Sequence, residues 1–220
     1  MKSVLLIGAT GLVGRNCLQQ LLSEKWVGMV TVLSRRPIDI KHKKLVCEIV
    51  DFDQIEKYKR RIKADVMISA FGTTIKQAGH DRELFYKWEV DYPLDTARIA
   101  FANGCRHFIF VSAVGTSDTS PVFYLKSKGQ METLALKIGF DTVDIFQPSF
   151  LQGRRENPRP GEVFFEKILG KLKFLFAGPF KKYTPVEASE LAEAIVKKAA
   201  NPRQGVYRYT WSDFQKILGR

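Results

Sequence analysis

The chain has 220 residues, of which 45% are hydrophobic and 12% aromatic, and its formal net charge is +12. This supports one well-buried core, and the chain is too short for two large domains. No apolar stretch approaches the roughly 20 residues that a membrane-spanning helix needs. The charge favours anionic partners such as nucleotide phosphates, acidic lipids or nucleic acid. It also fits a basic, solvated surface, which we prefer for most of these residues.

The N-terminus and the cysteines indicate a compartment. Met1-Lys2 leads directly into an apolar segment, without the charged region or cleavage site of a signal peptide. Cys17, Cys47 and Cys105 lie in or beside apolar segments and lack metal-ligand spacing, so we expect buried, reduced thiols. These features predict a cytoplasmic protein.

A glycine-rich turn follows the apolar residues 3–7 and precedes a helical pattern over residues 12–24. A short apolar run that ends at glycine is typical of a buried parallel strand. Strand, glycine turn and helix in this order form the phosphate-binding corner of a dinucleotide fold. Gly8 permits the turn, Gly11 lets the backbone approach a pyrophosphate, and Gly14 allows close packing of helix on strand. The predicted cofactor-binding residues here are Gly8, Thr10, Gly11, Leu12, Val13 and Gly14.

Strand-like and helical patterns alternate along the rest of the chain. Further strands are expected at residues 29–33, 45–50, 66–70, 107–112 and 142–146, with helices at 82–103 and 121–138. The alternation predicts an α/β fold, a doubly wound parallel sheet (Rossmann fold) in strand order 3-2-1-4-5-6.

The last part of the chain, residues 147–220, has shorter patterns. We expect a helix at 187–200, a strand at 206–209 and a helix at 211–218. These pieces are too small to fold alone, so we expect a single domain, 1–220, in which they contribute a small C-terminal lobe on the substrate side.

The residues after the second strand predict which nicotinamide cofactor binds. In this fold an acidic side chain here hydrogen-bonds the adenosine ribose of NAD, whereas an arginine accommodates the 2′-phosphate of NADP. The strand ends in Ser34, Arg35 and Arg36, and no acid lies between Val30 and Arg36. The sequence therefore predicts NADP(H), held in part by these three residues.

Two further strand ends meet the same edge of the predicted sheet. Asp51 and Phe52 follow the third strand, and the turn at Ala70, Phe71 and Gly72 follows the fourth. Because the carboxyl ends of parallel strands form the ligand crevice, we expect these residues at the cofactor; two ordinary turns are the alternative.

Ser112, Tyr124 and Lys128 are the candidate catalytic residues. Tyr124 and Lys128 are four residues apart and share one face of the helix expected after the fifth strand. A lysine ammonium near a phenol favours the phenolate and lowers its pKa from about 10 toward the range of a general acid or base. Ser112 ends the fifth strand, where its hydroxyl is expected to steady a substrate carbonyl. A surface Tyr–Lys pair is the alternative.

The chain resembles one branch of a known family over nearly its whole length. The resemblance rests on the segments GATGLVG, LSRR, ISAFGTT, VDYPL, FVSAVG, YLKSKG and QPSFLQGRRENPRPGE. They are similar to the Tat-interacting-protein-like (metastasis-suppressor-like) branch of atypical short-chain dehydrogenase/reductases. The resemblance implies NADP binding, with Asp51 and Phe52 at the adenine, Lys128 at the nicotinamide ribose and Pro148 also at the cofactor.

Two positions depart from the family's pattern. Asp91 stands where extended members carry a catalytic-site Asn, and Gln147 stands where many relatives have Arg before the Pro. The resemblance also implies that the tyrosine of this branch is displaced from its usual place. These departures bear on carbonyl chemistry and leave cofactor binding untouched.

The basic aromatic segment at residues 163–180 is expected to act as a lid over the nicotinamide pocket. A peripheral helix on an anionic membrane is the alternative that we do not favour. His42, His80 and His107 lack partners at metal spacing, so no metal is expected.

Together these features predict an NADP(H)-dependent oxidoreductase acting on an unidentified small carbonyl or alcohol. Tyr124 would donate the proton, Lys128 would hold the nicotinamide ribose and tune Tyr124, and Ser112 would orient the substrate. The alternative is a non-catalytic NADP(H)-sensing protein that regulates a macromolecular partner. Nucleic acid is not expected, because only the charge favours it and no motif reads bases.

Overall fold

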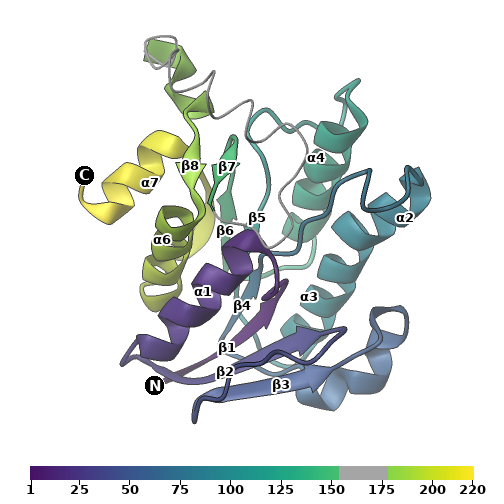
Figure 1. The fold of residues 1–220 in the computed structure, drawn as a ribbon, viewed down its shortest axis with the longest axis vertical. Helices are drawn as coiled ribbons and strands as arrows, with labels where there is room; N and C mark the ends of the chain where they lie inside the picture. The colour runs from purple at the N-terminus through teal and green to yellow at the C-terminus, as the bar shows by residue number, and fades with distance from the viewer. Residues whose placement is uncertain (154–177) are drawn as a thin grey trace.

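The computed structural model describes residues 1–153 and 178–220 (Figure 1). Its strands are β1 (Lys2–Ile7), β2 (Val27–Ser34), β3 (Leu45–Ile49), β4 (Val66–Ser69), β5 (His107–Val111), β6 (Thr142–Phe146), β7 (Leu151–Gln152), β8 (Val186–Glu187) and β9 (Gly205–Tyr209). Its helices are α1 (Leu12–Ser23), η1 (Phe52–Arg61), α2 (Arg82–Tyr86), η2 (Lys87–Asp91), α3 (Tyr92–Ala102), α4 (Phe123–Leu136), η4 (Gly178–Tyr183), α6 (Ala188–Ala200) and α7 (Trp211–Leu218).

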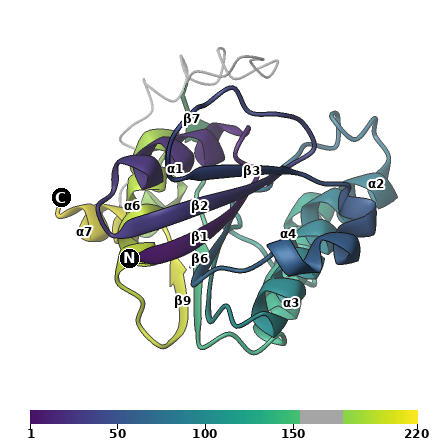
Figure 2. The ribbon, with the colours of Figure 1, turned by 90° about the horizontal axis from the view of Figure 1, so that it is seen from below.

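A seven-stranded parallel sheet forms the centre of the fold, in the order β3-β2-β1-β4-β5-β6-β9. The predicted order of the first six strands is confirmed, and β9 extends the sheet beyond β6. The central strands are apolar runs because helices cover both faces, with α1 and α6 on one side and α3 and α4 on the other (Figures 1 and 2). The strand order reverses between β1 and β4, and their carboxyl ends open the crevice expected of this topology.

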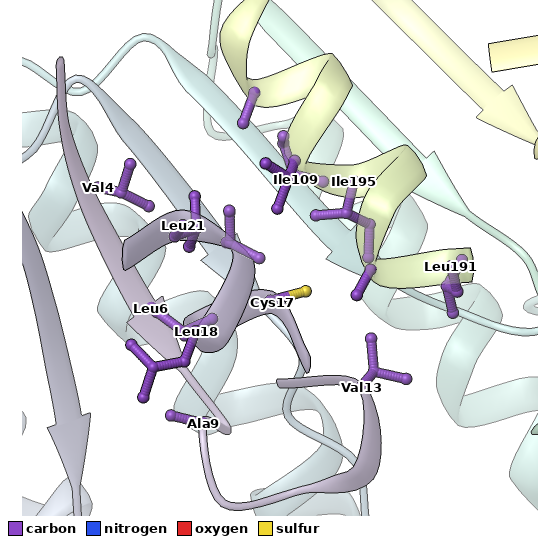
Figure 3. Packing of buried hydrophobic residues seen from close by; sticks show 14 of the residues in the cluster. Val4, Leu6, Ala9, Val13, Cys17, Leu18, Leu21, Ile109, Leu191 and Ile195 are labelled. Carbon is purple, nitrogen blue, oxygen red and sulfur yellow. The ribbon is translucent and has the colours of Figure 1, made fainter. Parts of the chain in front are cut away.

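Apolar side chains bind the helices to the sheet. Figure 3 shows Val13 and Cys17 of α1 in one layer with Leu191 and Ile195 of α6, and all four are buried. Burial raises the pKa of the Cys17 thiol to about 12, so this thiol stays protonated and unreactive. Cys47 is only half-buried, because β3 is an edge strand, and this corrects the expectation that every cysteine is buried.

Two helical segments differ from the sequence prediction. The predicted helix over residues 82–103 contains a π-helical turn, η2, between α2 and α3. Such turns are rare and occur often at functional sites. The 3₁₀ segment η1 was not expected; Asp51 caps it by accepting a hydrogen bond from the Asp53 amide at 3.0 Å.

The elements after residue 147 lie in two places. β9 completes the main sheet beside β6, and α6 packs against α1. β7 and β8 pair with each other in a separate two-stranded parallel sheet. Within the described ranges no helix has the length and apolarity needed to cross a membrane.

A buried polar cluster joins β5, β6 and β9. His107 Nε2 lies 2.6 Å from Asp144 Oδ2, and the Tyr209 hydroxyl donates to Asp144 Oδ1 at 2.7 Å. Asp144 is fully buried. Burial, together with the Asp144 hydrogen bond, raises the pKa of Tyr209, so its hydroxyl remains a donor to the carboxylate.

Tyr209→Phe is expected to lower the free energy of unfolding by about 1.5 kcal/mol, because a hydrogen bond to a charged, buried group is worth about 1.5–3 kcal/mol. Urea unfolding measures the change. Tyr207→Phe is the control on the same strand, since its hydroxyl donates to the Gln204 carbonyl at 3.0 Å on an exposed edge. Equal losses in the two variants would contradict a special role for the Asp144 cluster.

Candidate functional site

Two glycines where β1 meets α1 leave no room for a side chain of their own. Gly8 has φ of +80°, and a Cβ there would lie 2.5 Å from the Ala70 carbonyl carbon. A Cβ on Gly14 would lie 2.1 Å from the Gly8 oxygen. The Gly11 amide donates to that oxygen at 3.0 Å, and α1 carries no acid in its first turn. A bare backbone cradle at the N-terminus of a 12-residue helix fits a phosphate, as a dinucleotide site requires.

A cavity of about 870 Å³ opens beside this turn at the carboxyl edge of the sheet. It brings together many of the residues predicted for the site from five separate stretches of sequence. Those that line it are Gly11, Leu12, Val13, Ala70, Phe71, Gly72, Ser112, Tyr124, Lys128 and Pro148. Gly8, Thr10, Gly14, Ser34, Arg35, Arg36, Asp51 and Phe52 do not line this cavity.

Lys128 forms a buried ion pair with Glu89 of η2 in the cavity wall. Its Nζ also donates to the Val111 carbonyl at 2.9 Å, and the other Glu89 oxygen accepts from the Thr73 amide at 2.9 Å. Burial, the largest single cause, lowers the pKa of Lys128, but the charge and hydrogen bond of Glu89, with the charges of Tyr124 and Glu132, together outweigh it, and the pKa is raised. Lys128 is therefore a fixed, charged group at the cavity.

Ser112 is held by a second buried carboxylate, Glu132 of α4. The Ser112 hydroxyl donates to Glu132 Oε1 at 2.6 Å, and Gln147 Nε2 donates to the same oxygen at 2.8 Å. Arg208 Nε of β9 contacts Glu132 Oε2 at 3.0 Å. The hydroxyl proton of Ser112 is thus directed at Glu132, whereas the sequence analysis expected it at a substrate carbonyl.

Tyr124 lies on the same helix face as Lys128 and is 40% exposed at the cavity. Its ring packs edge-on to Phe85 of α2, with centroids 6.2 Å apart. It is close enough to Lys128 to contribute to the raised lysine pKa. The two side chains therefore share one wall, as the four-residue spacing predicts.

The predicted 2′-phosphate residues lie at the end of β2, away from the cavity. Arg35 and Arg36 are exposed, and Ser34 is buried, with its hydroxyl accepting from the Arg36 amide at 3.3 Å. The Arg35 guanidinium stands 5.2 Å from the centre of the Trp88 ring, which orients it. Both arginines are thus available to an anionic ligand.

At the end of β3 the two predicted adenine contacts differ in accessibility. Asp51 is exposed, and its carboxylate also accepts from the Gln54 side chain at 3.0 Å. The Phe52 ring is buried and stacks on Tyr92, with centroids 5.3 Å apart. Its side chain belongs to the core, so only its backbone faces any ligand in this region.

Sequence reasoning missed two buried carboxylates, Glu89 in the cavity wall and Glu132 behind Ser112, although the sequence contains a signal for each. Glu132 continues the four-residue spacing of Tyr124 and Lys128 along α4. Glu89 lies four residues after the buried Phe85 and so falls on the apolar face of its helix. A charged side chain on the apolar face of a helix indicates that a group of opposite charge is buried beside it.

Three further expectations from the sequence concern Asp91, a metal site and the segment 163–180. Asp91, at the end of η2, is half-buried, and burial raises the pKa of its carboxyl. Among the described residues no cluster of His, Cys, Asp or Glu has the arrangement of a metal site. The proposed lid or membrane segment, residues 163–180, lies mostly in the stretch 154–177, outside the described residues.

Comparison with known proteins identifies the family. The sequence pattern of the NAD dependent epimerase/dehydratase family matches residues 4–127, more than half of the chain. The chain belongs to this family. It is 30% identical over 208 residues to Protein HTATIP2 of Rattus norvegicus, with 93% of this chain and 84% of that protein covered. This similarity confirms the resemblance to the Tat-interacting-protein-like branch.

A fungal relative corrects the expected location. The mitochondrial protein FMP52 of Meyerozyma guilliermondii is 36% identical over 208 residues, covering 90% of this chain and 85% of its own. The cytoplasmic location predicted from the N-terminus and cysteines is contradicted by this finding. Reduced thiols and an N-terminal strand do not distinguish these two compartments.

Solved structures bear out the fold. The Bordetella bronchiseptica enzyme WbmH, in complex with NAD+, has a TM-score of 0.72 at 16% identity, with 96% of this chain and 76% of that chain covered. The oxidoreductase ylbE of Lactococcus lactis has a TM-score of 0.65 at 14% identity, with 99% of this chain and 97% of that chain covered. At these identities the likeness is one of fold, with the same Rossmann topology.

Proposed function

We propose that this family member binds NADP(H) and acts as an oxidoreductase on an unidentified small carbonyl or alcohol. The observation that carries the proposal is the single cavity bordered by the glycine turn, Ser112, Tyr124 and Lys128. When bound, NADPH supplies a hydride. Tyr124 donates the proton that completes the reduction, and Lys128, fixed by Glu89, holds the nicotinamide ribose.

The remaining residues bind the phosphate groups of the cofactor. The bare turn at Gly8, Gly11 and Gly14 receives the pyrophosphate, and Arg35 with Arg36 receives the 2′-phosphate. We also propose that the substrate is a small molecule and that the chain is a single domain whose substrate side includes residues 148–152 and Tyr183, since β9 and α6 belong to the main sheet and its helix layer. A panel of small aldehydes and ketones tests the function: NADPH consumption supports it, and binding without consumption does not.

One observation favours a second function, cofactor-dependent regulation of a protein partner. Ser112 and Lys128 both already bond to buried carboxylates, Glu132 and Glu89, which restrains their use in catalysis. Tight NADPH binding without turnover, with a partner whose affinity depends on the cofactor, is the result that selects this function.

Replacing Arg35 and Arg36 together by Ala is expected to erase most of a preference for NADPH over NADH of at least about 10-fold. The reason is the loss of charge-assisted contacts, worth about 1.5–3 kcal/mol, which only the 2′-phosphate makes. Fluorescence titration with both cofactors measures the ratio. The charge-matched control Arg60→Ala/Lys63→Ala removes two exposed cations elsewhere. Equal affinity of the unmodified protein for NADPH and NADH would refute NADP selectivity.

A further inference from the structure

The Glu89–Lys128 pair is the most buried charged group in the wall of the cavity. The side chain of Lys128 is 5% exposed and that of Glu89 is 0% exposed. Three elements hold the pair. Lys128 lies on α4 and Glu89 on η2, and the lysine Nζ donates to the Val111 carbonyl of β5 at 2.9 Å. The Thr73 amide, in the turn after β4, donates a hydrogen bond to the Glu89 carboxylate. A pair held from four sides does not rearrange to suit a ligand.

Within the cavity wall the two charges of the pair cancel each other. Among the described residues that line the cavity, only Glu89, Lys128 and Arg82 are charged, and the Arg82 guanidinium lies over the Phe123 ring at 5.3 Å. Glu132, the next carboxylate along α4, is compensated by Arg208. Lys128 alone would give its wall a full positive charge, and Glu89 cancels it.

We propose that Glu89 allows the cavity to accept both redox states of the nicotinamide cofactor, by cancelling the charge of Lys128. The inference rests on the proposed function, which assigns Lys128 to the nicotinamide half. The oxidised ring carries a positive charge and the reduced ring is neutral, so an uncompensated ammonium repels only the oxidised form. Because the pair is buried, this repulsion is weakly screened. Glu89 removes it, and the protein then binds NADP+ and NADPH with comparable strength at this end.

The test compares the ratio of dissociation constants, Kd for NADP+ over Kd for NADPH, by isothermal titration calorimetry at pH 8.0. The ratio cancels every contact that the two forms share. Glu89→Gln leaves one positive charge and is expected to raise the ratio at least about threefold. Lys128→Met leaves one negative charge and is expected to lower it. Glu89→Gln/Lys128→Met removes both charges and is expected to restore the ratio of the unmodified protein.

Two controls separate this effect from others. Glu83→Gln removes an equal charge from an exposed position on α2 and leaves the ratio unchanged. Adenosine 2′,5′-bisphosphate lacks the nicotinamide half, so its affinity stays the same in every variant. If Glu89→Gln fails to fold with an unpaired buried lysine, the opposite shift in Lys128→Met still tests the proposal.

Three results overturn the inference. They are an unchanged ratio in both single variants, a shift in the same direction in both, and a double variant that keeps the shift of Glu89→Gln. If the unmodified protein binds neither cofactor nor the bisphosphate, the proposed function fails, and the inference falls with it. Normal binding of all three ligands with an unmoved ratio overturns the inference alone.

Discussion

Tyr124→Phe is expected to lower kcat for reduction of a carbonyl substrate by about 10²–10⁴, the usual contribution of a positioned general acid. The Tyr124 ring lies at the mouth of the cavity, edge-on to Phe85, and phenylalanine preserves that packing. Affinity for NADPH should barely change, because the phosphates are assigned to the glycine turn and the arginines. Steady-state rates with the best carbonyl substrate, together with calorimetric titration of NADPH, measure the two effects.

Tyr207→Phe is a suitable control for this experiment, because Tyr207 lies on β9 outside the cavity lining and its hydroxyl donates to the Gln204 carbonyl. Turnover by Tyr124→Phe equal to that of the unmodified protein would contradict proton donation by this residue. A loss of cofactor affinity equal to the loss of rate would instead assign the hydroxyl to binding. In either case the sensing function becomes the better account of the site.

The fold was predictable because its signals are local. Each central strand is a short apolar run, and the glycine turn after residues 3–7 fixes the first strand–helix unit and hence the sheet edge where ligands bind. The segment η1 escaped prediction because its sequence is largely polar and fully buries only Phe52 and Ile55. The π-helical turn at Lys87–Asp91 has no distinct signature, since its backbone conformation follows from packing.

The sequence predicted many of the residues that line the site, but it did not predict the hydrogen bonds and ion pairs that these residues form. The spacing of Tyr124 and Lys128 placed both on one wall, but nothing local states that Lys128 binds Glu89, 39 positions earlier in the sequence. The hydroxyl of Ser112 similarly depends on Glu132, which reaches it only after α4 packs beside β5. Such bonds are products of tertiary packing, so a residue's neighbours along the chain do not reveal them.

Gly14→Ala is expected to destabilise the protein by at least about 2 kcal/mol, although alanine favours an isolated helix by about 1 kcal/mol over glycine. The sign reverses because the new Cβ would lie 2.1 Å from the Gly8 oxygen and 2.7 Å from the Gly8 carbonyl carbon. These are backbone atoms, which give way only if the whole turn moves away from α1. Urea unfolding measures the loss.

The same displacement should weaken NADPH binding by about 10- to 100-fold, because the amides of the turn lose their alignment with the pyrophosphate and each charge-assisted contact is worth about 1.5–3 kcal/mol. Gln19→Ala is the matched control, since Gln19 is exposed on the same helix and contacts no part of the turn. It should leave both stability and cofactor affinity unchanged. A stable Gly14→Ala protein with undiminished NADPH affinity would show that the close contact between Gly8 and Gly14 is not needed for binding, and the phosphate would then have to be placed elsewhere.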